Sequence, residues 1–139
     1  MATLKLEIVT PEAVTFSDNV EMVTLPGIEG EMGIYPQHVP LMTQIVPGEI
    51  AVRRNGQDVL LAVGEGFVEV TGESVSVLTD MAITADNIDE AKAEEARKRA
   101  EARLAEKLSD EEAAVVQAAL ANSVAQLNVK RRTRRCPPP

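Results

Sequence analysis

Residues 50–63 read IAVRRNGQDVLLAV, two apolar runs on either side of the pair Asn55-Gly56. An Asn-Gly pair is the strongest short signal for a two-residue hairpin turn, because both central positions of that turn need a positive φ. The flanking runs contain the β-branched and large aliphatic residues that favour strands. The stretch therefore predicts a β-hairpin and indicates that the surrounding sequence forms a β domain.

Short strands are also predicted on both sides of this hairpin. Four further segments carry strand patterns: 4–8, 20–25, 67–70 and 75–78. Residues 71–74, which read TGES, predict a second hairpin turn between the last two segments. Residues 27–48 are dense in Gly and Pro and predict short extended pieces joined by fixed turns. Many short antiparallel strands with such frequent turns indicate a sandwich or a barrel.

Beyond the last predicted strand, the sequence changes to a composition of strong helix formers. Asp86-Asn87 can cap a helix over residues 88–108, which are rich in Ala, Glu, Lys and Arg. Ser109 followed by Glu112 is a capping box, and it predicts a second helix that ends at about Asn128. The connection is so short that the two helices are expected to lie antiparallel.

The two predicted helices offer each other thin apolar stripes. The stripes consist of Ala93, Ala96, Ala100, Leu104 and Leu108 on the first helix and of Ala113, Val116, Leu120, Ser123, Val124 and Leu127 on the second. Contacts between alanines bury little apolar area, which stabilises by only ~25 cal/mol per Å². The hairpin is therefore expected to be marginal alone and to dock, undock or rearrange.

The composition limits the classes of protein that fit. At 139 residues, the chain has room for one ordinary domain and an appendage. Cys136 is the only cysteine, which excludes a disulfide within the chain. No apolar run approaches the ~18 residues that suggest a bilayer span, and the start does not read as a signal peptide. We therefore expect a cytoplasmic location and only indirect membrane association.

The net charge of −8 is divided unevenly along the chain. Residues 1–84 hold three basic residues against twelve carboxylates, a net charge of −9, whereas residues 85–139 hold eleven against ten, a net charge of +1. An acidic sheet domain repels nucleic acid, and three aromatic residues offer little for base stacking. Residues 130–139, basic and ending in prolines, are expected to be a disordered tail, with electrostatic binding as the alternative.

A catalytic role finds little support in the sequence. His38 is the only histidine, which excludes a His–His metal site and a His-paired dyad. A small hydrolase that uses His38 and Glu31 would still need a nucleophile, and no Ser or Cys stands in a recognisable setting. The glycine-rich residues 27–33 lack the Gly-Lys-Ser/Thr ending of a phosphate loop and carry two carboxylates. We expect no catalytic residues and no metal.

A basic stripe recurs along the first predicted helix. It consists of Lys92, Arg99, Arg103 and Lys107, at intervals of seven, four and four residues. Two interpretations are open. The stripe is either a solvated face supported by pairs such as Glu95–Arg99, or a docking face for an acidic partner or a nucleotide.

The segment of residues 25–43 reads LPGIEGEMGIYPQHVPLMT and is followed by Ile45-x-Pro47-Gly48. Residues 64–70, GEGFVEV, and residues 75–82, VSVLTDMA, continue in order. On these motifs the chain resembles the epsilon subunit of bacterial F-type ATP synthases. The resemblance covers all but about the last ten residues.

The resemblance implies a fold of a ten-stranded antiparallel β-sandwich over residues 1–84, followed by a two-helix hairpin over residues 85–129. Such a subunit is non-catalytic and turns with the rotor of the proton-translocating synthase at the cytoplasmic face of the plasma membrane. Its sandwich would hold the gamma subunit and touch the ring of c subunits. The implied contact loop contains Glu31, Gly33, Tyr35, His38, Leu41 and Met42.

The resemblance also implies a regulatory role for the helices, which would oppose ATP hydrolysis. The basic stripe would then meet an acidic segment of the beta subunit. Some relatives bind ATP through Ile/Leu-Asp-x-x-Arg-Ala, and here residues 88–93 read IDEAKA. The implied nucleotide residues are Ile88, Asp89, Lys92, Ala93 and Arg99.

Two departures from the pattern of ATP-binding relatives weaken that implied site. Lys92 replaces the arginine and loses the planar fork that grips phosphate. Asn122 and Gln126 stand where such relatives tend to place arginines. We therefore expect no cofactor, with ATP left as a regulatory ligand to be tested. The alternative function is a free-standing adaptor that binds an acidic protein or nucleic acid through its basic arm and tail.

Overall fold

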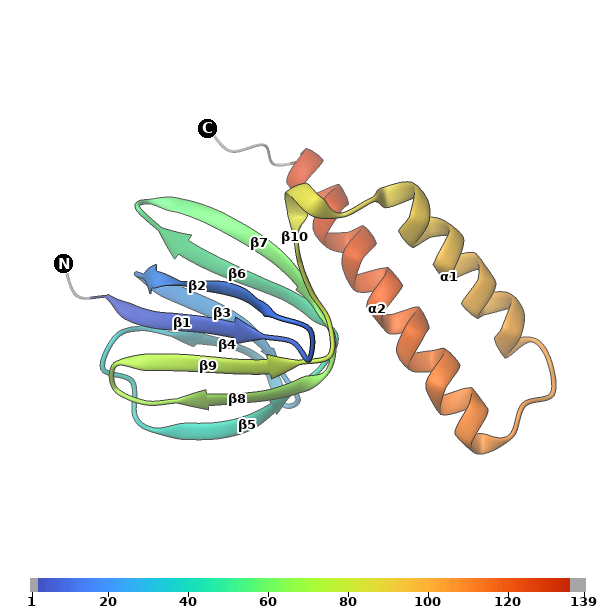
Figure 1. Ribbon diagram of the computed structural model, residues 1–139, viewed down its shortest axis with the longest axis horizontal. Helices are drawn as coiled ribbons and strands as arrows, with labels where there is room; N and C mark the ends of the chain where they lie inside the picture. Colours follow the sequence, from blue (N-terminus) through green and yellow to red (C-terminus); the bar gives the residue numbers. More distant parts are fainter. Residues whose placement is uncertain (1–2, 136–139) are drawn as a thin grey trace.

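The computed structural model describes residues 3–135, with side chains as far as residue 132, and forms a β-sandwich joined to a helical hairpin (Figure 1). The strands are β1 (Leu4–Val9), β2 (Val14–Val20), β3 (Met22–Gly27), β4 (Gly30–Ile34), β5 (Leu41–Ile45), β6 (Gly48–Arg54), β7 (Gln57–Val63), β8 (Gly66–Val70), β9 (Ser74–Thr79) and β10 (Ala82–Thr84). A 3₁₀ turn, η1 (Ala85–Asn87), leads to the helices α1 (Glu90–Leu104) and α2 (Asp110–Arg135). The sandwich-plus-hairpin fold is therefore confirmed.

The strands follow the order β10-β7-β6-β3-β5-β8-β9-β1-β2, with β4 paired to β3. This hydrogen-bonded path folds over into two layers, and a single residue pair, Gly27 with Ile45, joins β3 to β5. One pairing differs from the expected antiparallel pattern, because β1 and β9 run parallel. Parallel neighbours need a long connection, and here the whole intervening domain provides it.

The central hairpin has the predicted turn. Arg54 pairs with Gln57 across β6 and β7, and Asn55 and Gly56 between them have φ values of 54° and 76°. Positive φ at both positions is the geometry that Asn-Gly favours. The second predicted hairpin is also present, since β8 pairs antiparallel with β9. Both hairpin predictions are confirmed.

The strand predicted over residues 20–25 is wrong in its boundaries. Residue Glu21 separates β2 from β3, and most of β2 carries no strand pattern in the sequence. Its residues are largely exposed and polar, because β2 lies at the edge of the sheet and only Val20 is buried. Residues 27–48, expected as short extended pieces and turns, contain β4 and β5.

The core of the sandwich is aliphatic. Its buried residues are Leu4, Leu6, Ile8, Val20, Val23, Leu25, Ile34, Ile45, Ile50, Val52, Leu61, Val63, Val68, Val70, Val75 and Val77. Every member lies in a strand between residues 4 and 77, and no residue of the described helices belongs to it. The sandwich thus has a core of its own.

The first helix starts later and ends earlier than the sequence predicts. Asp86 and Asn87 lie in η1, and the N-cap is Asp89, whose carboxylate accepts a hydrogen bond from the Lys92 N–H at 3.1 Å. Ile88 is extended and buried against the sandwich, which excludes it from the helix. The connection that reverses the chain begins at Ala105, so α1 ends before the predicted limit.

The second helix is longer than the sequence predicts. The Ser109 hydroxyl accepts a hydrogen bond from the Glu112 N–H at 3.2 Å, which confirms the serine half of the predicted capping box. However, α2 continues to Arg135, so the expected end at Asn128 and the disordered tail are wrong for residues 130–135. The first three of those residues have partners on other elements, described below. Residues 136–139, including Cys136, lie outside the described residues.

Helix α2 lies between the sandwich and α1 (Figure 1). The C-terminal half of α2 packs through Ala125 and Val129 on a second apolar cluster that includes Ala62, Ala85 and Ile88. On its other side, α2 receives the alanine stripe of α1. The predicted stripe residues on both helices are buried or half-buried.

Candidate interaction surfaces

The predicted contact loop is divided between the two layers of the sandwich. Glu31 and Gly33 lie on β4, in the layer that faces α2, and Leu41 and Met42 lie on β5, in the other layer. Tyr35 and Met42 are 61% and 69% exposed. The half-buried His38 places Nδ1 2.6 Å from the carbonyl oxygen of Val39. The predicted loop thus presents exposed Tyr35 and Met42, whereas its carboxylate, Glu31, lines a groove beneath α2.

A row of exposed apolar side chains crosses the layer that the helices leave uncovered. The strand register pairs Phe67 with Leu78, Leu78 with Val9, and Val9 with Val14. Residues paired across neighbouring strands share a face of the sheet, and so do alternate residues along one strand. Met42 lies on the same face, because Gln44, two residues further along β5, pairs with Phe67. We call Val9, Val14, Met42, Phe67 and Leu78 the apolar row.

Val14, Met42, Phe67 and Leu78 of the apolar row are exposed, and Val9 is half-buried. The exposed fractions are 57% for Val14 and 58% for both Phe67 and Leu78. A hollow of about 390 Å³ lies beside Leu78 and Val9, bounded by Pro11 and Gly66. Sequence reasoning identified Met42 alone. The signal for Phe67 and Leu78 was available, because the alternating valines of β8 and β9 turn inward and leave these two residues on the outer face.

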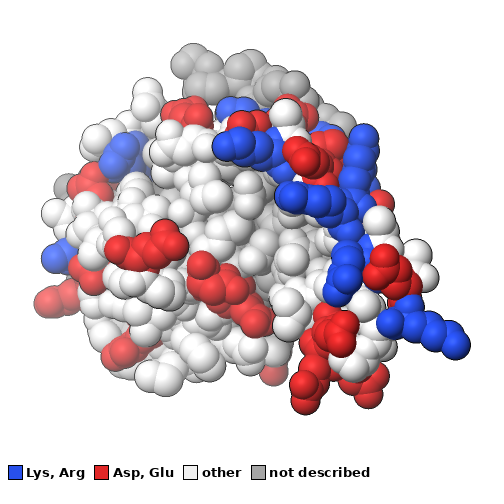
Figure 2. Space-filling view, turned by 45° about the vertical axis from the view of Figure 1, so that its right-hand side comes forward, with Lys and Arg blue, Asp and Glu red and all other residues white. Residues whose placement is uncertain are grey.

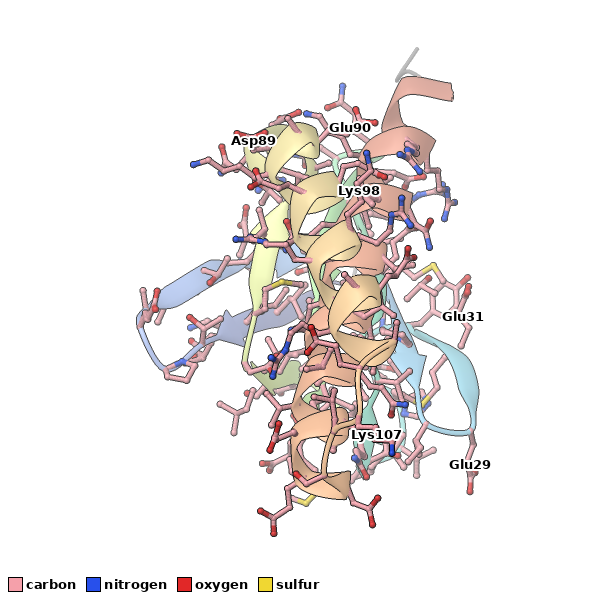
Figure 3. All side chains as sticks on the ribbon, turned by 90° about the vertical axis from the view of Figure 1, so that its right-hand side faces the viewer. Glu29, Glu31, Asp89, Glu90, Lys98 and Lys107 are labelled. Atoms are coloured by element: carbon pink, nitrogen blue, oxygen red, sulfur yellow. The ribbon has the colours of Figure 1, made fainter. Side chains whose placement is uncertain are left out.

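The basic stripe is exposed but not one continuous helical face. Lys92, Arg99 and Arg103 project from α1, whereas Lys107 lies in the connection at the loop end of the hairpin (Figure 3). Arg103 forms ion pairs with Glu106 at 3.5 Å and Glu112 at 3.8 Å. The helical spacing predicted for Lys107 is therefore wrong, because α1 ends three residues before it.

Lys and Arg side chains gather along the arm, while the sandwich carries mainly carboxylates (Figure 2). Within the described residues, Lys92, Arg99 and Lys107 form no ion pair. These cations therefore remain available to an acidic partner.

The implied nucleotide residues serve mainly structural roles in this conformation. Ile88 and Ala93 are buried, and the carboxylate of Asp89 caps α1. Lys92 and Arg99 are exposed on the helix surface. On α2, the side-chain amide of Gln126 donates to Met81 Sδ at 3.1 Å. None of these five nucleotide residues lines the groove beneath α2 or the hollow beside Leu78.

The last described turns of α2 carry three consecutive basic residues with three sets of partners. Lys130 Nζ donates to the backbone carbonyl of Ala85 at 3.1 Å. Arg131 forms ion pairs with Glu90 at 3.3 Å and Glu94 at 3.1 Å. Arg132 forms an ion pair with Glu49 on β6. We call Lys130, Arg131 and Arg132 the clasp; the sequence assigned them to a disordered tail.

Two carboxylate partners of the clasp arginines have pKa values shifted in opposite directions, although each arginine by itself acts to lower the pKa of its partner. Burial raises the pKa of Glu49, and nearby Glu31 adds to the rise, while Arg132 opposes it. The pKa of Glu94 is lowered, first by the hydrogen bond from Arg97 and then with help from Arg131. Glu49 and Arg132 also border a groove of about 480 Å³ between α2 and the outer face of β3 and β6.

The described residues contain no candidate metal site. In this part of the chain, no three His, Cys, Asp or Glu side chains gather closely enough to hold a metal ion. Neither described helix contains an apolar stretch long enough to cross a lipid bilayer.

The chain matches two family models that adjoin each other along the sequence. Residues 3–85 match the family described as ATP synthase, Delta/Epsilon chain, beta-sandwich domain, and residues 86–131 match the long alpha-helix domain of the same chain. The chain therefore belongs to the delta/epsilon family of ATP synthase chains. The resemblance to the epsilon subunit of bacterial F-type ATP synthase is confirmed.

Its relatives agree on the epsilon type. A protein of Dehalococcoides mccartyi named ATP synthase epsilon chain is 45% identical over 138 residues, which are 99% of each chain. A protein of the same name from Laribacter hongkongensis is 43% identical over 129 residues, 91% of this chain and 92% of the relative.

The fold also occurs in a solved assembly. A chain of the Euglena gracilis mitochondrial ATP synthase, in a structure of OSCP, F1 and the c-ring, superimposes with a TM-score of 0.77. It is 23% identical, over 92% of this chain and 81% of that one, so it supports the fold alone.

Proposed function

We propose that this chain is a non-catalytic central-stalk subunit of the proton-translocating ATP synthase, placed between the catalytic head and the ring of c subunits. The family membership supports a place in the ATP synthase complex. The apolar row supports the role of a subunit that binds a partner there. Phe67, Leu78 and Val14 are more than half exposed on one face of the sheet. Adjacent large apolar side chains on a surface mark a place that a partner covers.

The gamma subunit is the partner that we assign to the apolar row. A flat sheet face with a row of aliphatic and aromatic side chains suits a stable rather than a transient contact, because burial of apolar surface drives association. The tips of the contact loop, Tyr35 and Met42, would extend this surface toward the c-subunit ring. The assembly would lie at the cytoplasmic face of the plasma membrane.

The helical hairpin is the regulatory element of the proposal. In the described conformation it covers the sandwich layer opposite the apolar row and presents Lys92 and Arg99 to solvent. Released, it would carry these cations to the acidic segment of the beta subunit and oppose ATP hydrolysis. No cofactor is needed for this role. ATP would bind the arm weakly, because Lys92 lacks the arginine fork and Asp89 caps α1.

The test of the proposed interface is a charge placed in the apolar row. Phe67→Asp should weaken binding of the chain to purified gamma subunit by at least about thirtyfold, the usual effect of losing a central aromatic anchor. Val115→Asp is the matched control, since Val115 is 71% exposed but lies on α2, away from the row. Binding can be measured by titration calorimetry or co-purification.

Circular dichroism should confirm that both variants keep the fold of the unmodified chain. Equal affinity of the Phe67→Asp variant and the Val115→Asp control would contradict the assignment of the apolar row to gamma.

A further inference from the structure

The clasp connects the end of α2 to three different elements of the fold. Consecutive residues of an α-helix point about 100° apart, so three in a row can reach three directions. Here Lys130 reaches η1, Arg131 reaches α1, and Arg132 reaches β6. One short segment thus joins both helices and the sandwich.

The docking of the arm is concentrated at this same end. The α2 residues in the buried cluster that meets the sandwich are Ala125 and Val129, whereas Val115, near the other end, is 71% exposed. Toward the loop that connects its helices, the arm slants away from the sheets (Figure 1). Three of the five buried members of this cluster are alanines, and larger side chains such as Leu60 and Ile83 are only half-buried against it. Alanines bury little area, so the charged contacts at this end add to what holds it.

The connection to the sandwich also lies at this end. Ala85 and Ile88 link β10 to α1, and the clasp binds the carbonyl of Ala85 and the first turn of α1 beside them. If α2 leaves the sandwich, only the covalent link at residues 85–89 keeps the arm attached there. The clasp contacts must break before α2 can leave.

We propose that the basic end of α2 is a clasp that holds the arm in its docked position, and that breaking its contacts is the step that frees the arm. This goes beyond the proposed regulatory role, and the isolated chain is enough to test it. Removing one partly exposed ion pair should raise the population of released arm roughly two- to fivefold, and removing the three pairs of Arg131 and Arg132 roughly tenfold. Salt should act in the same direction, because it screens exposed charges.

The experiment is hydrogen exchange of the full-length chain, followed amide by amide at low and at high salt. Exchange through local opening reports the population of the open form. Arg131→Gln with Arg132→Gln should speed exchange in α2 residues 120–132 by roughly tenfold at low salt, while β1, β8 and β9 stay unchanged. The matched control is Lys98→Gln, a cation on α1 that forms no described ion pair and should leave the exchange of α2 unchanged.

A charge swap tests whether the specific ion pair between Arg132 and Glu49, rather than any cation at the end of the helix, holds α2 in place. Glu49→Arg combined with Arg132→Glu keeps the ion pair but places a carboxylate near the C-terminus of α2, where the helix dipole disfavours it. If the clasp holds the arm, amides of α2 should exchange more slowly in this double variant than in Arg132→Glu alone. Unchanged exchange in the double glutamine variant, or no rescue by the swap, would overturn the proposal.

Discussion

At the scale of single residues, Glu49 shows how burial and two neighbours set one titration. Its carboxyl lies at the groove beneath α2, paired with Arg132 and near Glu31. Burial raises its pKa above the ordinary value of 4.5. The folded chain therefore holds this proton more tightly than the unfolded chain does.

The sign of the pH effect follows from that shift. Glu49 contributes stability that is fully present below its unfolded pKa and is lost as the pH rises through its raised folded pKa. Glu49→Gln should therefore make the free energy of unfolding less dependent on pH just above the ordinary pKa of 4.5. Urea denaturation at a series of pH values measures this dependence.

Two neighbouring substitutions provide the control for this assignment. Arg132→Gln should raise the pKa of Glu49 further, and Glu31→Gln should lower it, because the two neighbours act in opposite directions. Carbon-detected NMR titration of the Glu49 carboxyl reads both shifts. If the pKa of Glu49 moved in the same direction in both variants, Arg132 and Glu31 would not have opposite effects on it.

At the scale of the elements, the sandwich and the helices differ in what holds them. The sandwich core consists of strand residues alone, and the helices dock through a separate, smaller cluster. Among the strands, β6 and β7 receive most of the contact with α2. The two parts are thus joined by a limited surface.

We expect residues 1–84 to fold without the arm. Deleting the arm exposes Leu60, Ala62 and Ile83 to water. The loss of this burial should lower the free energy of unfolding by about 1–3 kcal/mol. A cooperative urea transition, followed by fluorescence of Tyr35 and by circular dichroism, checks this. A truncated chain without such a transition would show that the arm is part of the folding unit.

At the scale of the whole molecule, charge and apolar surface are separated. The exposed apolar row lies on one layer of the sandwich, and the cationic arm covers the other. A subunit can therefore keep one face attached to a partner while the arm on the opposite face changes position. This division is the structural basis of the proposed regulation.

Deleting residues 85–139 should therefore raise ATP hydrolysis by the assembled catalytic head. Neutralising Lys92, Arg99 and Arg103 together should reproduce much of the gain, because three exposed pairs together shift a population by about tenfold. The effect should weaken at high salt. Hydrolysis rates of matched complexes at low salt measure it, and Lys98→Gln serves as the single-charge control.

Equal rates for the full-length and the truncated subunit at low salt would contradict the regulatory role. That outcome would leave the proposed contact between the sandwich and gamma untouched.

The sequence by itself determined the hairpins, the aliphatic core, the capping box and the family. Each depends on neighbours in the chain: Asn55-Gly56 needs its own φ values, and Ser109 caps a helix three residues away. Local physics of this kind can be read from residue order. It also explains why the thin alanine stripes were predicted correctly.

Only the tertiary structure decided which surfaces face outward and how the chain ends. Phe67 and Leu78 meet across one hairpin, but Val9 joins their row only because β1, distant in sequence, pairs in parallel with β9 in a particular register. Residues 130–132 were expected to be disordered because the sequence near them shows no partner. Their partners, Glu49, Ala85 and the first turns of α1, lie some 40 to 80 residues away, and folding alone brings them to the end of α2.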